Sequence, residues 1–136
     1  MPVRILMIAL GGGLGALARY ALGRAWGGDH LAIPVTTLTI NLLGSLLLGA
    51  LVVAVTEVWH PHPNLRPFLG TGVLGGFTTF STFAVQAQQL PAAQLWLYLA
   101  LSLAGGVICA AGGMSLLRKL KPRRGPAVAL IDPDLP

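Results

Sequence analysis

Apolar residues fill four long stretches of this 136-residue chain, and polar residues gather in the short segments between them. The stretches run approximately over Ile5–Trp26, Pro34–Val58, Arg66–Gln88 and Gln94–Leu117. Each is close to the ~20 residues that an α-helix needs to cross the hydrocarbon layer of a bilayer. They are too long, and alternate too little, to be the strands of about 10 residues found in membrane barrels. The pattern therefore predicts an all-α integral membrane protein with four transmembrane helices.

Short connections separate the stretches, at Gly27–Ile33, Trp59–Leu65 and Gln89–Ala93. Connections of this length predict that consecutive helices are antiparallel neighbours. Residues 1–118 then form one four-helix transmembrane domain. Residues 119–136 form a basic C-terminal tail, which we expect to be disordered because of its prolines and aspartates.

The composition excludes a water-soluble domain, because 54% of the residues are hydrophobic and only 10% are charged, against about 25% charged in soluble proteins. The net charge of +5 does not indicate a nucleic-acid partner, since five of the nine basic residues lie between residues 118 and 124. A basic cluster directly after an apolar stretch is typical of a membrane flank. Counted with this cluster, Lys and Arg predict cytoplasmic termini; without it, the two sides are nearly balanced. The single cysteine, Cys109, excludes an internal disulfide.

Small residues recur at four-residue spacing in all four stretches. Such spacing lets helix backbones approach closely in a membrane, so we interpret these residues as packing positions. The pairs are Gly11 and Gly15, Ser45 and Gly49, Gly72 and Gly76, Gly106 and Ala110, and Cys109 and Gly113.

Glycines interrupt the third stretch, and the pair Gly75-Gly76 comes directly before Phe77-Thr-Thr-Phe-Ser-Thr-Phe83. Glycine weakens a helix, and the Thr and Ser side chains that follow can bond to their own backbone and stabilise a break. A broken helix in a bilayer is tolerated only where it lines a cavity or coordinates an ion. The sequence therefore predicts a third helix that is broken mid-membrane at Gly75-Gly76, with a functional site there.

Other polar side chains lie within the apolar stretches. Asn41 is deep in the second stretch, where its amide either links helices or donates N–H groups to a passing ligand. Arg19 is either a plain interfacial anchor or part of a positive vestibule that concentrates anions. In the fourth stretch, Tyr98 and Ser102 form an i, i+4 hydroxyl pair, which either continues a polar track or bonds to backbone carbonyls.

Phe80 and Phe83 are three residues apart and share one helix face, with Thr79 and Thr82 beside them. Aromatic ring edges carry partial positive charge, so an edge can face an anion while neighbouring hydroxyls donate hydrogen bonds to it. Aromatic residues at helical spacing also serve as packing alone. The spacing by itself leaves both interpretations open.

Three motifs together resemble the small bacterial fluoride channels of the Fluc (CrcB) family. They are Gly12-Gly-Leu-Gly-Ala-Leu-Ala-Arg-Tyr20, Asn41-Leu-Leu-Gly-Ser45 and Gly72-Val-Leu-Gly-Gly-Phe-Thr-Thr-Phe-Ser-Thr-Phe83. The resemblance covers all four stretches and leaves out only the tail. It implies a multi-pass protein of the bacterial inner membrane that exports cytoplasmic fluoride passively, without enzyme activity. It also implies an antiparallel, dual-topology homodimer with two fluoride pathways and a structural Na⁺ on the two-fold axis.

The resemblance further implies roles for individual residues. The backbone carbonyls of Gly75 and Thr78 would hold the Na⁺. A vestibule arginine, a pore asparagine, a phenylalanine box and a polar track would line the fluoride pathway. These residues are Arg19, Asn41, Phe80, Phe83, Thr79, Thr82, Tyr98 and Ser102.

The chain departs from the family pattern at two positions. Gln86 stands where a carboxylate is common, and Gly106 stands where a hydroxyl is expected one turn beyond Ser102. The resemblance therefore implies a conduction track that is shorter or differently polar here. In addition, the basic tail favours one orientation, whereas dual topology requires nearly balanced charge.

Two other classes of protein fit a chain with four short spans. A small dual-topology multidrug-type exporter would need a carboxylate within the first span, and the first stretch has none. In a non-conducting membrane assembly subunit, the run of Phe and Thr residues in the third stretch would be packing alone.

Overall fold

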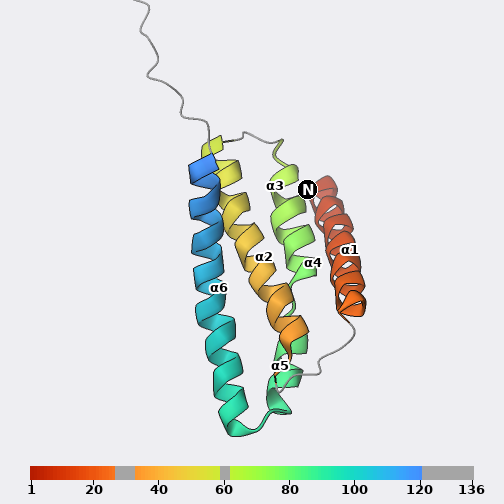
Figure 1. Ribbon diagram of the computed structural model, residues 1–136. Helices are drawn as coiled ribbons and strands as arrows, with labels where there is room; N and C mark the ends of the chain where they lie inside the picture. Colours follow the sequence, from red (N-terminus) through yellow and green to blue (C-terminus); the bar gives the residue numbers. More distant parts are fainter. Residues whose placement is uncertain (27–32, 59–61, 121–136) are drawn as a thin grey trace, which may run out of the picture.

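The structure, a computed structural model, describes residues 1–26, 33–58 and 62–120 (Figure 1). All regular structure in these ranges is helical, and four helices are long and apolar enough to cross a membrane: Pro2–Ala25, Val35–Val58, Leu65–Gln88 and Ala92–Leu120. The predicted all-helical fold with four spans is confirmed, and each predicted boundary lies within three residues of the observed one.

The first and fourth spans are single helices, whereas the second and third are composite. The first is α1 (Pro2–Ala25) and the fourth is α6 (Ala92–Leu120). The second joins α2 (Val35–Val53) to a π-helical turn, η1 (Ala54–Val58). The third joins α3 (Leu65–Pro67), the π-helical segment η2 (Phe68–Leu74), α4 (Gly75–Phe77) and α5 (Ser81–Gln88).

Parts of the sequence-based prediction lie outside the described residues. These are the loop residues 27–32 and 59–61 and the tail residues 121–136. The domain boundary predicted after residue 118 falls inside α6, which continues through Lys119 and Leu120. The remaining connection, at residues Gln89–Pro91, is a tight turn between α5 and α6.

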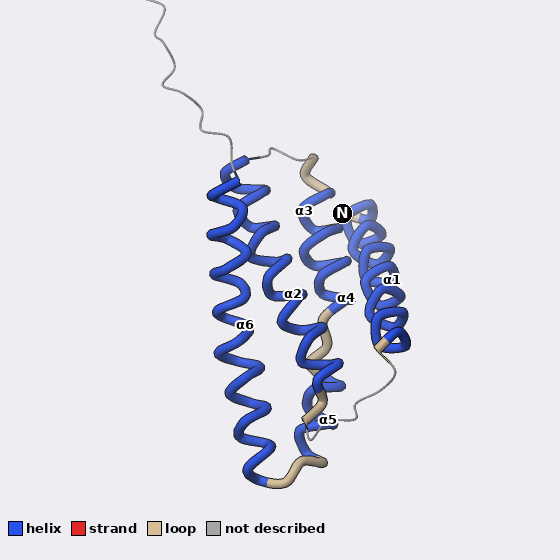
Figure 2. The backbone as a smooth tube through the Cα atoms, in the orientation of Figure 1, coloured by secondary structure: helices blue, strands red, loops and turns tan. Residues whose placement is uncertain are grey.

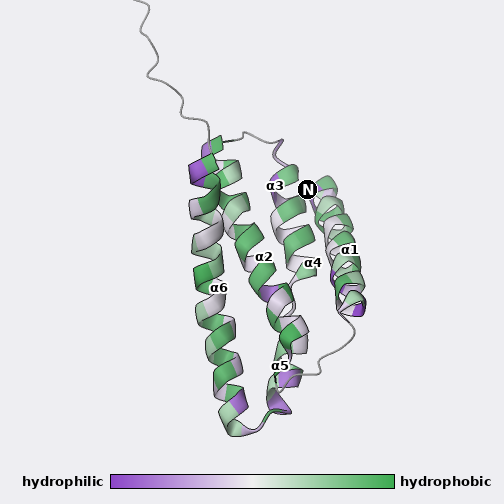
Figure 3. Ribbon diagram, in the orientation of Figure 1, coloured by the Kyte–Doolittle hydropathy of each residue, from purple (hydrophilic) through white to green (hydrophobic). Residues whose placement is uncertain are grey.

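The four spans lie side by side (Figure 1). The start of α1 and the end of α6 lie at the same end of the bundle. α2 packs along α6, whereas α1 packs on η2 and α4. At the end where η1 and α6 finish, Arg118 forms an ion pair with Glu57 at 2.8 Å. Most of the helical ribbon carries the colour of hydrophobic residues, and hydrophilic residues gather mainly near the ends of the helices (Figure 3).

Glycines allow α1 and the third span to touch backbone to backbone. A Cβ atom on Gly15 would overlap the carbonyl oxygen of Val73, and a Cβ atom on Gly76 would overlap the carbonyl oxygen of Gly12. The α2–α6 contact is built in the same way, because a Cβ atom on Gly113 would overlap a carbonyl oxygen of α2. The interpretation of these small residues as packing positions is confirmed.

The prediction that Gly75-Gly76 itself interrupts the third span was wrong. Gly75 is helical, with φ −64° and ψ −36°, and Gly76 follows it within α4. The chain leaves helical geometry at Thr78 (φ −77°, ψ 160°), and residues 78–80 separate α4 from α5 (Figure 2). Gly76 lies against the backbone of α1, where its missing side chain allows α4 to pack directly on Gly12.

Candidate functional site

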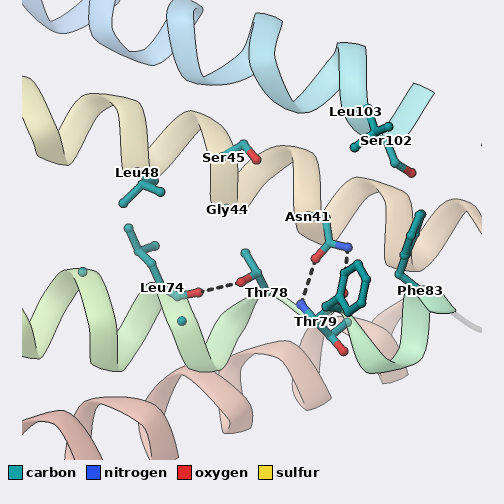
Figure 4. Close-up of a pocket in the computed structure, with 13 residues that line it drawn as sticks. Asn41, Gly44, Ser45, Leu48, Leu74, Thr78, Thr79, Phe83, Ser102 and Leu103 are labelled. Carbon is teal, nitrogen blue, oxygen red and sulfur yellow. Dashed lines mark hydrogen bonds between the residues drawn. The ribbon is translucent and has the colours of Figure 1, made fainter. Parts of the chain in front are cut away.

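A cavity of about 370 Å³ lies beside the non-helical segment of the third span (Figure 4). It is bounded by α2, by the third span and by α6. The side chains that line it, all from the described part of the chain, include none that is charged. Of the ten residues predicted for the site, seven line this cavity: Asn41, Gly75, Thr78, Thr79, Phe80, Phe83 and Ser102.

The amide of Asn41 binds both backbone groups of Thr79 (Figure 4). Its Nδ2 donates to the Thr79 carbonyl oxygen at 3.0 Å, and the Thr79 N–H donates to its Oδ1 at 2.9 Å. A break in a helix leaves backbone groups that must find partners elsewhere when water is scarce. Asn41 supplies those partners from α2, so it links two spans, which was one of the two roles considered for it.

The break changes the acceptors of two backbone N–H groups. In a continuous helix, the N–H of Thr79 would donate to the carbonyl of Gly75, but here it donates to Asn41. Likewise, the N–H of Thr82 would donate to the carbonyl of Thr78, but here it donates to Thr79 Oγ1 at 3.2 Å. The carbonyls of Gly75 and Thr78 thereby lose the donors that a continuous helix would give them.

Hydroxyl groups cluster at the start of α5. Thr79 Oγ1 donates to Thr82 Oγ1 at 3.0 Å and lies 3.4 Å from Ser81 Oγ, where either atom can be the donor. Thr79 is buried, whereas Thr82 and Ser81 are exposed. Because a hydroxyl that accepts a hydrogen bond keeps its own hydrogen, Thr82 remains able to donate to a ligand.

Three aromatic rings form a row beside the cavity. Phe83 lies between the other two, with centroid distances of 5.7 Å to Phe80 and 5.0 Å to Tyr98. Tyr98 is completely buried, but Phe80 is 78% exposed. The row therefore runs from the interior of the protomer to its surface. The contact between Phe83 and Tyr98 could not be predicted, because it joins two different spans.

Two buried polar atoms lack a hydrogen-bond partner among the described residues: Ser102 Oγ and Gln86 Oε1. A buried polar atom without a partner costs about 1–3 kcal/mol, so such atoms are rare unless a ligand or water serves them. Ser102, which the resemblance assigns to the polar track, lines the cavity. The burial of Gln86 Oε1 was missed, because the sequence singled Gln86 out only as a departure from the family pattern.

The remaining predicted residues lie around the cavity and do not line it. Thr82 is bonded to Thr79, and Tyr98 packs behind Phe83. Arg19 is half-buried on α1. No group of three His, Cys, Asp or Glu side chains that could hold a metal occurs within residues 1–26, 33–58 and 62–120.

Four apolar helices, three of which bound a cavity lined by uncharged side chains, define a small multi-pass helical membrane protein. Within that class, residues 6–114 match the family described as "CrcB-like protein, Camphor Resistance (CrcB)". The chain belongs to this CrcB-like family, as the three motifs predicted.

Several relatives carry the name "Fluoride-specific ion channel". The chain is 44% identical over 115 residues to FluC 2 of Nocardia farcinica, and this match covers 85% of the chain and 82% of the relative. It is 42% identical over 126 residues to FluC of a Ruegeria species, covering 87% and 97%. It is 49% identical over 86 residues to FluC 2 of Streptomyces avermitilis, but this match spans 63% of the chain and only about half, 54%, of that relative.

Proposed function

We propose that this protein is a fluoride-selective channel of the bacterial inner membrane that lets cytoplasmic fluoride leave by passive conduction. The names of the relatives support this proposal. The observation that carries it is the cavity at the break, where neutral hydrogen-bond donors and phenylalanine rings meet without a charged side chain among the described lining residues.

The physical demands of fluoride match such a cavity. The ion is small and strongly hydrated, so a pore must replace its water with other donors, yet bind it weakly enough to release it. The second hydrogen on Asn41 Nδ2 and the hydroxyls of Thr82 and Ser102 can serve as donors. The ring edges of Phe80 and Phe83 add weak positive potential without a full charge that would trap the anion.

Two further residues complete the proposed pathway. Tyr98 closes the inner end of the aromatic row, where its packing fixes the orientation of Phe83. Arg19, half-buried near the end of α1, would attract anions toward an entrance. Fluoride would then pass from a positive vestibule to neutral donors, which favours entry as well as release.

The channel is proposed to be an antiparallel, dual-topology homodimer. The cavity places Asn41 and Ser102 beside Phe80, whose 78% exposure marks an uncovered edge. Ser81 and Thr82, close to Phe80 in the chain, are also exposed, and polar groups in contact with lipid are costly. A second copy laid over this edge would remove that cost and enclose the pathway. An antiparallel arrangement would bring the break of one protomer against the break of its partner.

The proposed structural cation is a Na⁺ held by the carbonyls of Gly75 and Thr78. These carbonyls are suitable ligands for Na⁺, because both lose their helical N–H donors at the break. In membrane proteins, Na⁺ binds backbone carbonyls of unwound helices. The cation would supply a fixed positive charge between the two protomers. The chain itself provides the neutral oxygens and keeps them free of N–H donors.

Fluoride efflux from liposomes that contain the purified protein tests the channel. We expect fluoride to leave much faster than from empty vesicles, while chloride is retained. Phe80→Ile should slow fluoride efflux without changing the oligomer, because it removes a ring edge and keeps an apolar side chain. Phe68→Ile removes a ring from η2, outside the cavity, and serves as the control. Efflux no faster than from empty vesicles would reject the proposal.

A further inference from the structure

The backbone N–H of Thr79 can bind either of two acceptors, depending on the backbone conformation at the break. The observed acceptor is Asn41 Oδ1, at 2.9 Å. The alternative is the carbonyl of Gly75, which this N–H would bind if α4 continued by one more residue. The two states exclude each other, because the second converts the start of the break into helix and occupies the oxygen of Gly75.

The amide of Asn41 is held in a single orientation. A rotation that broke its bond to the Thr79 N–H would also break the 3.0 Å bond from Nδ2 to the Thr79 carbonyl. One turn farther along α2, Gly44 lies so close to the break that a Cβ atom there would overlap Thr78 Cγ2. α2 therefore fits tightly against residues 78 and 79, and its asparagine cannot drift away from Thr79.

We propose that Asn41 is a positioning residue for the cation site: by accepting the N–H of Thr79, it keeps the Gly75 carbonyl free to bind the cation. This inference rests on the proposed function, in which Gly75 and Thr78 hold Na⁺. Thr79 Oγ1 acts in the same way on the other carbonyl, because it accepts the N–H of Thr82 that would otherwise donate to Thr78.

The inference gives a single asparagine two separable tasks. Its Oδ1 controls a carbonyl of the cation site, and its remaining Nδ2 hydrogen is available to the anion. Two substitutions of nearly the same size separate these tasks. Asn41→Asp keeps an acceptor for the Thr79 N–H, in either protonation state. Asn41→Leu keeps the shape but has no acceptor, so the Thr79 N–H must turn to Gly75 or remain unpaired.

The test measures how Na⁺ stabilises the purified protein in detergent. Thermal unfolding is followed while Na⁺ replaces N-methyl-D-glucamine at constant ionic strength, and the Na⁺ concentration at half-maximal stabilisation is determined. We expect similar values for the wild type and Asn41→Asp. Asn41→Leu should need at least about tenfold more Na⁺, because loss of a group that orients a metal ligand typically weakens affinity 10–100-fold.

Matched variants keep the test decisive. Ser45→Ala alters α2 in the same cavity, but Ser45 makes no described hydrogen bond to the break, so its Na⁺ dependence should be unchanged. If Asn41→Leu fails to fold, Thr79→Val and Thr79→Ser replace it. Thr79→Val removes the acceptor of the Thr82 N–H and should weaken Na⁺ binding, whereas Thr79→Ser retains it.

The outcomes separate this inference from the channel itself. A wild-type value for Asn41→Leu, or equal losses in Asn41→Asp and Asn41→Leu, would overturn the inference. So would a wild-type protein that conducts fluoride but is not stabilised by Na⁺, and in that case the channel would stand. Conversely, the expected Na⁺ series in a protein that passes no fluoride would support the positioning role and reject the channel.

Discussion

Two hydroxyl groups that line the cavity differ in the number of hydrogen-bond partners they have. Ser102 Oγ is buried and has no hydrogen-bond partner among the described residues, whereas Thr79 Oγ1 has three. A hydroxyl in the first situation lowers stability, and one in the second raises it. Two hydroxyl groups of one cavity therefore have opposite effects on stability.

Ser102→Ala tests this contrast. We expect it to leave the free energy of unfolding unchanged, or to raise it by up to about 1 kcal/mol, because an unsatisfied buried group is removed. Fluoride efflux should slow, since a donor is lost. Thermal unfolding in detergent and efflux from liposomes measure the two effects. A marked loss of stability would show that Ser102 is a structural residue.

At the residue scale, the sequence identified the polar side chains but not their partners. Asn41 was recognised because an amide in an apolar stretch is costly. Its two bonds reach Thr79, 38 residues away, and no local spacing indicates such a pairing. Both roles considered for it remained open for this reason, and the geometry shows only the interhelical one.

At the scale of elements, the third span is held by glycines against α1. Its α4 segment touches the backbone of α1 at Gly12, and η2 touches it at Gly11. Propensity alone places the break at Gly75-Gly76, because glycine is a poor helix former. Tertiary packing reverses that preference, since a glycine is needed to bring the two backbones together. The number and limits of the spans were predictable because they depend on hydropathy, which is local.

Gly76→Ala should destabilise the protein by about 1–3 kcal/mol, because its methyl group would collide with the Gly12 carbonyl and backbone atoms cannot move aside as a flexible side chain can. Gly13→Ala is the matched control on α1, since nothing lies within 4 Å of its added Cβ atom. That variant should be as stable as the wild type or slightly more stable, as alanine favours helix. Equal unfolding temperatures for the two variants would contradict the packing argument.

At the scale of the whole molecule, the distribution of Lys and Arg between the two ends of the bundle influences its orientation in the membrane. Within the described residues, Arg4, Arg66, Arg118 and Lys119 lie toward the end that holds the N-terminus, and Arg19 and Arg24 lie toward the other. The ion pair of Arg118 with Glu57 is partly exposed, so it adds at most about 1 kcal/mol of stability. The ion pair therefore contributes little to the choice of orientation.

Dual topology predicts that the N-terminus lies on one side of the membrane in about half of the molecules and on the other side in the rest. In a Cys109→Ala background, Val3→Cys places one thiol at an exposed position. In sealed vesicles, a membrane-impermeant maleimide should label about half of these thiols, and the rest should react only after the membrane is opened. Labelling of nearly all or nearly none before opening would show a single orientation and would contradict the antiparallel dimer.

The bond between Asn41 and Thr79 also bears on the order in which the protein is built. While the third span is alone in lipid, its unpaired backbone groups would each cost several kcal/mol, so an unbroken helix is the favoured state during insertion. The free energy of the break falls only when α2 docks and the amide of Asn41 pairs with the backbone groups of Thr79. The site is then a product of helix assembly, and a chain whose second span is delayed would hold its third span straight, without the break beside which the cavity lies.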